Sequence, residues 1–162
     1  TEEEEEGERL SLWERISLIG YPMSGVFLVF FITFLIFPGV IDAIPYHATM
    51  GTPAIAKDEW WPILLLLEFN LCDTTGRFLA ARINWNERVT FWVSIVRSIT
   101  IPLFIFIARS TPPTGGIVFS NDVSAIVVML VFAFTNGLTA SRAMILAPQL
   151  TPKKDREAAG FL

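Results

Sequence analysis

Four apolar stretches, each long enough to cross a lipid bilayer, constrain the fold of this chain more than any other feature of its sequence. The stretches run from about 16 to 44, 62 to 81, 89 to 108 and 123 to 146. A spanning helix needs about 20 mainly apolar residues. A lone strand in lipid would leave its backbone polar groups unpaired, so we expect each stretch to be helical. The sequence therefore predicts an all-α polytopic membrane protein, with a membrane domain over residues 16–162 and the start of a fifth span near residue 158.

The composition supports a membrane protein and argues against other classes. Hydrophobic residues make up 52% of the chain and charged residues 17%, which is too apolar for an ordinary soluble domain and too lightly charged for disorder. Most of the acid lies in one run from Glu2 to Glu6, so residues 1–15 are expected to form an acidic, disordered cytoplasmic segment. The single cysteine, Cys72, can build neither a disulfide framework nor a thiolate cluster within one chain. We expect no metal, no cofactor and no nucleic-acid partner.

The distribution of basic residues predicts how the chain crosses the membrane. The residues that flank the first span, the turn around Asn84 and the final tail are Arg9, Arg15, Arg82, Arg88, Lys153, Lys154 and Arg156. Lys57 and Arg109 stand on the opposite side. By the positive-inside rule, both ends and the Asn84 turn are cytoplasmic, and Arg142 is expected to reach that interface. We expect a multi-pass integral protein of the plasma membrane rather than of an organelle membrane.

Opposite charges stand one helical turn apart in the second span, and they are the first candidates for function. Helical geometry places Asn70, Asp73 and Arg77 on one face. Charges inside a membrane are costly and usually face the protein interior, where polar solutes or ions are handled. Gly76 beside Arg77 would let a neighbouring helix approach closely. The alternative is an ion pair that only holds two helices together, although burying such a pair is rarely a net gain in stability.

Polar residues in the third and fourth spans are candidates for helix contact or gating. Arg97 needs an acidic or carbonyl partner, for which Asp73 could serve, and Pro102 permits a bend in the same span. Asn136 is costly in mid-span, and Gly137 admits a close neighbour. The residues expected at interhelical contacts or a hinge are Arg97, Asn136, Gly137 and Gly76.

Several motifs, taken in order, carry a family resemblance. They are Phe37-Pro38, Phe-Asn-x-x-Asp-x-x-Gly-Arg at 69–77, Arg97 followed by Pro102, and Val118-Phe119 to Asp122 leading into Phe132-Ala-Phe-Thr-Asn-Gly137. With the tail pattern of Pro148, Lys153-Lys154 and Glu157-Ala-Ala-Gly160, the chain resembles the carboxyl-terminal half of an equilibrative nucleoside transporter. The resemblance extends from about Leu10 to Leu162.

The resemblance implies a fold and a set of partners. The fold is a major-facilitator-like carboxyl-terminal helical bundle, a fragment that supplies the seventh to tenth helices and the start of the eleventh. The partners are a nucleoside or nucleobase substrate, the lipid bilayer and six amino-terminal helices of the same polypeptide. The implied substrate-binding residues are Phe37, Asn70, Asp73 and Arg77. One departure is that the family's usual Asn-Gly-Tyr reads Asn136-Gly137-Leu138 in this chain.

A transport mechanism follows from these residue types. Asp73 and Arg77 could bond ribose hydroxyls, and Phe37 could pack against the base. Transport by alternating access needs no covalent chemistry, so we do not expect an enzyme. A carboxylate paired with an arginine makes a poor proton carrier, so we expect facilitated diffusion. A structural membrane subunit and a proton-coupled carrier of another small polar solute are the alternatives.

Overall fold

The computed structural model describes residues 10–47, 60–110 and 120–152, and every regular element within these ranges is helical. The elements are α1 (Leu12–Ile36), α2 (Gly39–Asp42), α4 (Trp60–Ala80), α5 (Glu87–Val96), the 3₁₀ helix η1 (Arg97–Ile99), α6 (Thr100–Arg109) and α8 (Asp122–Leu150). The predicted all-α fold is confirmed for this part of the chain. Residues 1–9 of the predicted acidic segment and the predicted start of a fifth span near residue 158 lie outside the described ranges.

Three helical segments of the described chain are long and apolar enough to cross a membrane. They are Leu12–Asp42, Glu87–Arg109 and Asp122–Leu150. α4, with 21 residues, has the length of a span, but it carries Glu68, Asp73 and Arg77 and is less apolar than the other three. The chain is therefore an integral, multi-pass membrane protein, and the helix that holds the predicted charge pair is not among these three segments.

Polar side chains mark the points at which three helices begin. At the start of α1, Ser11 Oγ accepts from the amide of Glu14 over 3.4 Å, and Glu14 Oε2 accepts from the amide of Ser11 over 2.8 Å. This reciprocal capping box satisfies two amides that the helix leaves unpaired. Asn86 and Asn121 cap α5 and α8, each accepting a backbone amide over 2.9 Å.

Prolines divide two of the predicted stretches. α1 ends at Ile36, and the Phe37-Pro38 peptide bond, which is cis, leads into α2. In the third stretch, Pro102 has no amide to bond the carbonyl one turn earlier, and η1 lies at that point between α5 and α6. Arg97 is the first residue of η1, so it stands where the third stretch changes from α-helix to 3₁₀ helix.

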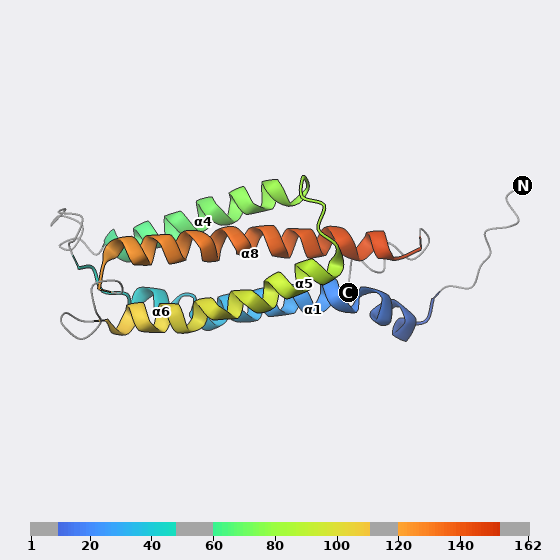
Figure 1. Ribbon diagram of the computed structural model, residues 1–162, viewed down its shortest axis with the longest axis horizontal. Coiled ribbons are helices and arrows are strands. Elements are labelled where there is room, and N and C mark those ends of the chain that lie inside the picture. Colours follow the sequence, from blue (N-terminus) through green and yellow to red (C-terminus); the bar gives the residue numbers. More distant parts are fainter. Residues whose placement is uncertain (1–9, 48–59, 111–119, 153–162) are drawn as a thin grey trace, which may run out of the picture.

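The helices form a bundle in which α8 is central. α8 contacts α4, α1, α5 and α6, and its contact with α4 is the most extensive in the molecule. Figure 1 shows α4 beside α8, with α1, α5 and α6 in a second layer. The start of α1, the turn at 81–86 and the end of α8 lie at one end of the bundle, together with Arg15, Arg82 and Arg88. The cytoplasmic position of that end stays a prediction of the positive-inside rule.

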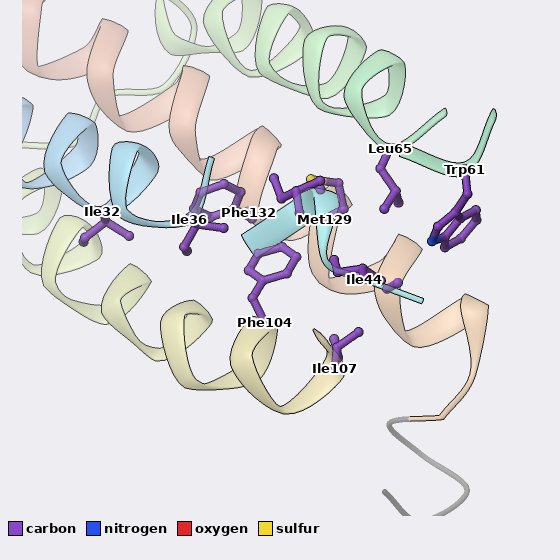
Figure 2. Close-up of a cluster of buried hydrophobic side chains, with 11 residues drawn as sticks. Ile32, Ile36, Ile44, Trp61, Leu65, Phe104, Ile107, Met129 and Phe132 are labelled. Atoms are coloured by element: carbon purple, nitrogen blue, oxygen red, sulfur yellow. The ribbon is translucent and has the colours of Figure 1, made fainter. Parts of the chain in front are cut away.

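The apolar core fills the opposite half of the bundle. Its members come from α1, α2, α4, α6 and α8, and include Ile32, Ile36, Ile44, Trp61, Leu65, Phe104, Ile107, Met129 and Phe132 (Figure 2). Lipid is as apolar as these side chains, so close packing rather than escape from water stabilises their contacts. Phe132 is fully buried, and its ring also lies 4.6 Å from the guanidinium carbon of Arg97. The core therefore ends at a buried polar region.

Candidate functional site

Asp73 and Arg77 form an ion pair on α4, as their helical spacing predicts. Arg77 Nε donates to Asp73 Oδ2 over 2.7 Å, and Arg77 Nη2 lies 3.5 Å from Asp73 Oδ1. The Asp73 side chain is 13% exposed, whereas that of Arg77 is 42% exposed. The carboxylate is thus directed into the bundle, and the guanidinium stays accessible at its surface.

Asn136 of α8 connects this pair to the rest of the bundle. Its Nδ2 donates to Asp73 Oδ1 over 2.7 Å. Its Oδ1 lies 2.7 Å from the hydroxyl of Thr33 on α1 and accepts from Arg97 Nη2 over 3.2 Å. Asn136 is 3% exposed, so a buried polar network joins α1, α4, η1 and α8. The free-energy cost of burying Asn136 in an apolar span is offset because both the oxygen and the nitrogen of its side-chain amide are hydrogen-bonded.

Arg97 is the cation at the centre of this network, with only 3% of its surface exposed. Its Nη1 donates to the carbonyl of Val29 and its Nη2 to the carbonyl of Phe132, both over 3.2 Å. Its Nε donates to the hydroxyl of Thr135, also over 3.2 Å. Sequence analysis expected an acidic or carbonyl partner, and the structure provides carbonyls. The amide of Asn136 links Asp73 to Arg97 by hydrogen bonds.

Gly76 and Gly137 lie in the contact between α4 and α8. A Cβ at Gly76 would clash with the carbonyl oxygen of Phe134 and lie 2.8 Å from the amide nitrogen of Leu138. A Cβ at Gly137 would clash with the carbonyl oxygen of Asp73 and lie 3.1 Å from the amide nitrogen of Arg77. Only glycine permits the two backbones to approach this closely. Leu138, which stands where the family that the sequence resembles usually has tyrosine, is buried.

Asn70 does not share the bonds of the ion pair. Its Nδ2 donates to the carbonyl of Leu66, one turn earlier on α4, over 2.8 Å, and its side chain is exposed. The sequence predicts one polar stripe of Asn70, Asp73 and Arg77, but in the structure Asn70 bonds its own backbone, and it is Asn136 that bonds Asp73. A local carbonyl is always within reach of an asparagine in a helix, and it satisfies the amide without any neighbour.

Phe37 lies apart from the charged pair, in an aromatic cluster at the end of α1. Its ring stacks on that of Phe69, with centroids 5.1 Å apart, and Phe69 in turn lies 5.9 Å from Phe132. A small apolar cavity of about 160 Å³ lies beside Phe37. It is lined by Phe37, Pro38, Ile41, Asp42, Pro62, Ile63 and Leu66. Phe37 thus presents an aromatic ring to a hollow on the α4 side of the bundle.

Three polar residues of the bundle interior were not identified as partners from the sequence. The hydroxyls of Thr33 and Thr135 accept hydrogen bonds from Arg97. A helical threonine usually bonds a carbonyl of its own helix, so the sequence around it does not indicate a distant partner. Arg142 was expected to reach the membrane interface. It is 7% exposed and donates from Nε and Nη2 to the carbonyl of Trp85, in the turn at 81–86, over 3.0 and 2.7 Å. It therefore fixes the turn between α4 and α5.

The arrangement can recognise a small polar molecule. A carboxylate has about four lone-pair sites, and Asp73 uses its two oxygens for Arg77 and Asn136, so it can still accept a hydroxyl. The exposed guanidinium of Arg77 can donate beside it. One acceptor and one donor, 2.7 Å apart on residues that stand one helical turn from each other, match a solute with neighbouring hydroxyl groups.

The sequence matches one family of membrane proteins along its whole length. A model of the family described as Nucleoside transporter matches residues 1–162. Equilibrative nucleoside transporter 4 of Danio rerio is 34% identical over 139 residues, which are 85% of this chain and 25% of that protein. Equilibrative nucleotide transporter 8 of Arabidopsis thaliana is 29% identical over 153 residues, which are 94% of this chain and 36% of that protein. The chain spans about a quarter to a third of the length of these curated relatives. It belongs to the nucleoside transporter family.

Proposed function

We propose that this chain forms the carboxyl-terminal part of a nucleoside or nucleobase transporter, a major-facilitator-like carrier that works by alternating access. The observation that carries the proposal is the Asp73–Arg77 pair, which has its carboxylate held against α8 and its guanidinium accessible. A charged pair inside a membrane protein is costly and usually marks the path of a polar solute. The names of the relatives, equilibrative nucleoside and nucleotide transporters, favour the same class of solute.

Substrate recognition would depend on hydroxyl groups. Asp73 accepts a hydrogen bond from a ribose hydroxyl, and Arg77 donates one to a hydroxyl or to a base carbonyl. In a cavity shielded from water, an analogue without the hydroxyl leaves one acceptor site of the Asp73 carboxylate without a donor, at a cost of about 1–3 kcal/mol. This loss gives the site its selectivity between solutes of similar size.

Phe37 and Asn70 would complete the binding surface. Phe37 offers a flat apolar ring beside the cavity at the end of α1, which suits the face of a nucleobase. Asn70 lies two turns before Arg77 on the same exposed face of α4, and its amide can leave the Leu66 carbonyl to bond the substrate. Gly76, Arg97, Asn136 and Gly137 hold the helices that carry these side chains.

Six amino-terminal helices of the same polypeptide would supply the other half of the cavity. Alternating access rocks one bundle against the other about a site near the membrane midplane. Asn136 stands midway between Asp122 and Leu150 in α8, which supports a position of the polar network near the midplane. The solute moves down its own gradient across the plasma membrane, and no covalent step occurs, so the protein is a carrier and not an enzyme.

Uptake by the complete protein in a transport-deficient host tests this function. Uptake of radiolabelled uridine and adenosine should be saturable and should reach equal concentrations on both sides of the membrane. An imposed pH gradient should not change the rate of uptake. Uptake that tracks a pH gradient at zero nucleoside gradient would replace facilitated diffusion by proton coupling. Absence of saturable uptake of any nucleoside or nucleobase would refute the proposal.

Variants of the ion pair separate a carrier from a structural subunit. Asp73→Asn and Arg77→Lys should leave insertion near normal and lower uptake by about tenfold to a hundredfold, because a charge-assisted bond to the substrate contributes about 1.5–3 kcal/mol. Arg88→Lys, at an exposed position of α5, is the matched control for Arg77→Lys. A pair that only holds helices together predicts loss of folded protein instead.

A further inference from the structure

The amide of Asn136 is held in one orientation by two charged neighbours. Its oxygen faces the guanidinium of Arg97 over 3.2 Å, and its nitrogen faces the carboxylate of Asp73 over 2.7 Å. A half-turn of the amide would set donor against donor at Arg97 and acceptor against acceptor at Asp73. Both bonds are charge-assisted and therefore stronger than bonds between neutral groups. Asn136 thus has one stable orientation.

Arg97, which faces the amide oxygen, has little freedom of its own. Its guanidinium bonds the carbonyl of Val29 on α1 and the carbonyl of Phe132 on α8, and the ring of Phe132 covers it. The side chain begins at η1, so the change of helix type in the third stretch is pinned to two other helices. The position of Asn136 is consequently determined by α1, η1 and α8 together.

The carboxylate of Asp73 is fixed at two points. Oδ2 accepts from Arg77 Nε and Oδ1 accepts from Asn136 Nδ2, each over 2.7 Å. The Arg77 side chain is 42% exposed and can change rotamer. Without the bond from Asn136, Asp73 would follow Arg77, and its free lone pairs would no longer have a fixed direction.

We propose that Asn136, oriented by Arg97, is a positioning residue that sets the direction in which Asp73 accepts the substrate. The proposal rests on the proposed function, in which Asp73 bonds a hydroxyl of the solute. It assigns Asn136 no contact with the solute: the residue acts through the carboxylate of Asp73. Asparagine suits this position because one amide offers an acceptor to a cation and a donor to an anion at the same time.

Asn136→Asp tests the proposal in the complete protein. Arg97 and the Thr33 hydroxyl keep an oxygen to bond, and each carboxylate has an arginine, so the bundle should still fold. The bond to Asp73 is replaced by repulsion between two carboxylates. We expect the KM for uridine uptake to rise by about tenfold or more, with Vmax per inserted protein changed less. An unchanged KM at normal insertion would overturn the proposal.

If Asn136→Asp alone does not insert into the membrane, a variant in which the side chains of Asp73 and Asn136 are exchanged provides a second test. The double variant Asp73→Asn with Asn136→Asp keeps an amide and a carboxylate between α4 and α8, and gives Arg97 a direct anionic partner. It should insert as the wild type does, yet take up no more uridine than Asp73→Asn alone, because the carboxylate has left α4. Wild-type uptake by the double variant, or its failure to insert, would contradict the proposal.

Thr139→Val is the matched control on α8. Thr139 is fully buried, and its Oγ1 has no hydrogen-bond partner among the described residues. The KM of the Thr139→Val variant for uridine should equal that of the wild type.

The results for these variants also distinguish the positioning role of Asn136 from the proposed function. Normal uptake by Asp73→Asn would refute the role of Asp73 itself, whereas loss of uptake by Asp73→Asn with an unaffected Asn136→Asp would refute only the positioning role of Asn136.

Discussion

Gly76 of α4 and Gly137 of α8 each lie against the backbone of the other helix. Gly137 approaches the carbonyl of Asp73 and the amide of Arg77, the two residues that form the ion pair. The closest contact between the helices is therefore at the same turn as the charges. Because α4 approaches α8 so closely there, the short side chain of Asn136 can reach the carboxylate of Asp73.

Gly137→Ala should destabilise the bundle. The added methyl group would overlap the Asp73 carbonyl oxygen, which is backbone and cannot move aside alone. We expect a loss of about 1–3 kcal/mol or more from such overpacking. Thermal unfolding of the purified protein in detergent measures the effect. Gly20→Ala on α1, where a Cβ would meet no atom within 4 Å, is the control and should leave stability equal or slightly higher.

Arg97→Gln should be among the most damaging substitutions in the chain. A glutamine amide cannot reach the carbonyls of Val29 and Phe132 together with the oxygen of Asn136, so buried acceptors lose their donors. Each unsatisfied group costs about 1–3 kcal/mol. The amount of folded protein recovered from membranes should fall sharply. Arg109→Gln, at an exposed position near the end of α6, should be recovered as the wild type is, and equal recovery of both variants would argue against a buried hub at Arg97.

Arg142→Met should weaken the turn between α4 and α5 without changing substrate affinity. The Trp85 carbonyl loses both of its donors, while the ion pair on α4 keeps its partners. Limited proteolysis at the turn should become faster, and the KM for uridine should stay the same. A higher KM with unchanged proteolysis would show that Arg142 acts at the substrate site.

Phe37→Leu should lower affinity for nucleosides and leave the fold intact. Leucine keeps an apolar side chain beside the cavity but removes the ring that stacks on Phe69. An aromatic pair, such as the Phe37 ring with a nucleobase, contributes about 0.5–1.5 kcal/mol beyond its buried area, so the KM should rise by about twofold to tenfold. Phe34→Leu, a 75% exposed position on α1, serves as the comparison. Equal KM values for the two variants would exclude a contact between Phe37 and the base.

Local spacing predicted part of this structure and non-local geometry determined the rest. The lengths of the apolar stretches predicted the helices, Pro102 predicted the irregularity in the third stretch, and the i, i+4 spacing predicted the pair of Asp73 and Arg77. The bond from Asn136 to Asp73 depends on how α8 aligns with α4, which no single-helix pattern contains. The bond from Asn70 to the carbonyl of Leu66 was likewise not predicted, and its role in substrate binding stays a prediction.

Arg97 and Arg142 show the same limit. Both were recognised as charges that need an explanation, but the carbonyls that accept from them lie on other segments of the chain. A helical carbonyl is normally bonded within its own helix, so nothing in its residue type marks it as the acceptor for a distant arginine. The spacing of glycines was more informative, because Gly76 and Gly137 did lie where two helices approach closely.

The most direct test of the central claim compares one nucleoside with one analogue in the complete protein. Uptake of uridine and of a dideoxy analogue lacking both ribose hydroxyls is measured for the wild type and for Asp73→Asn. If Asp73 bonds a ribose hydroxyl, the wild type should prefer uridine by about tenfold or more, and Asp73→Asn should lose most of that preference. An equal preference in both proteins, at equal amounts in the membrane, would contradict the account.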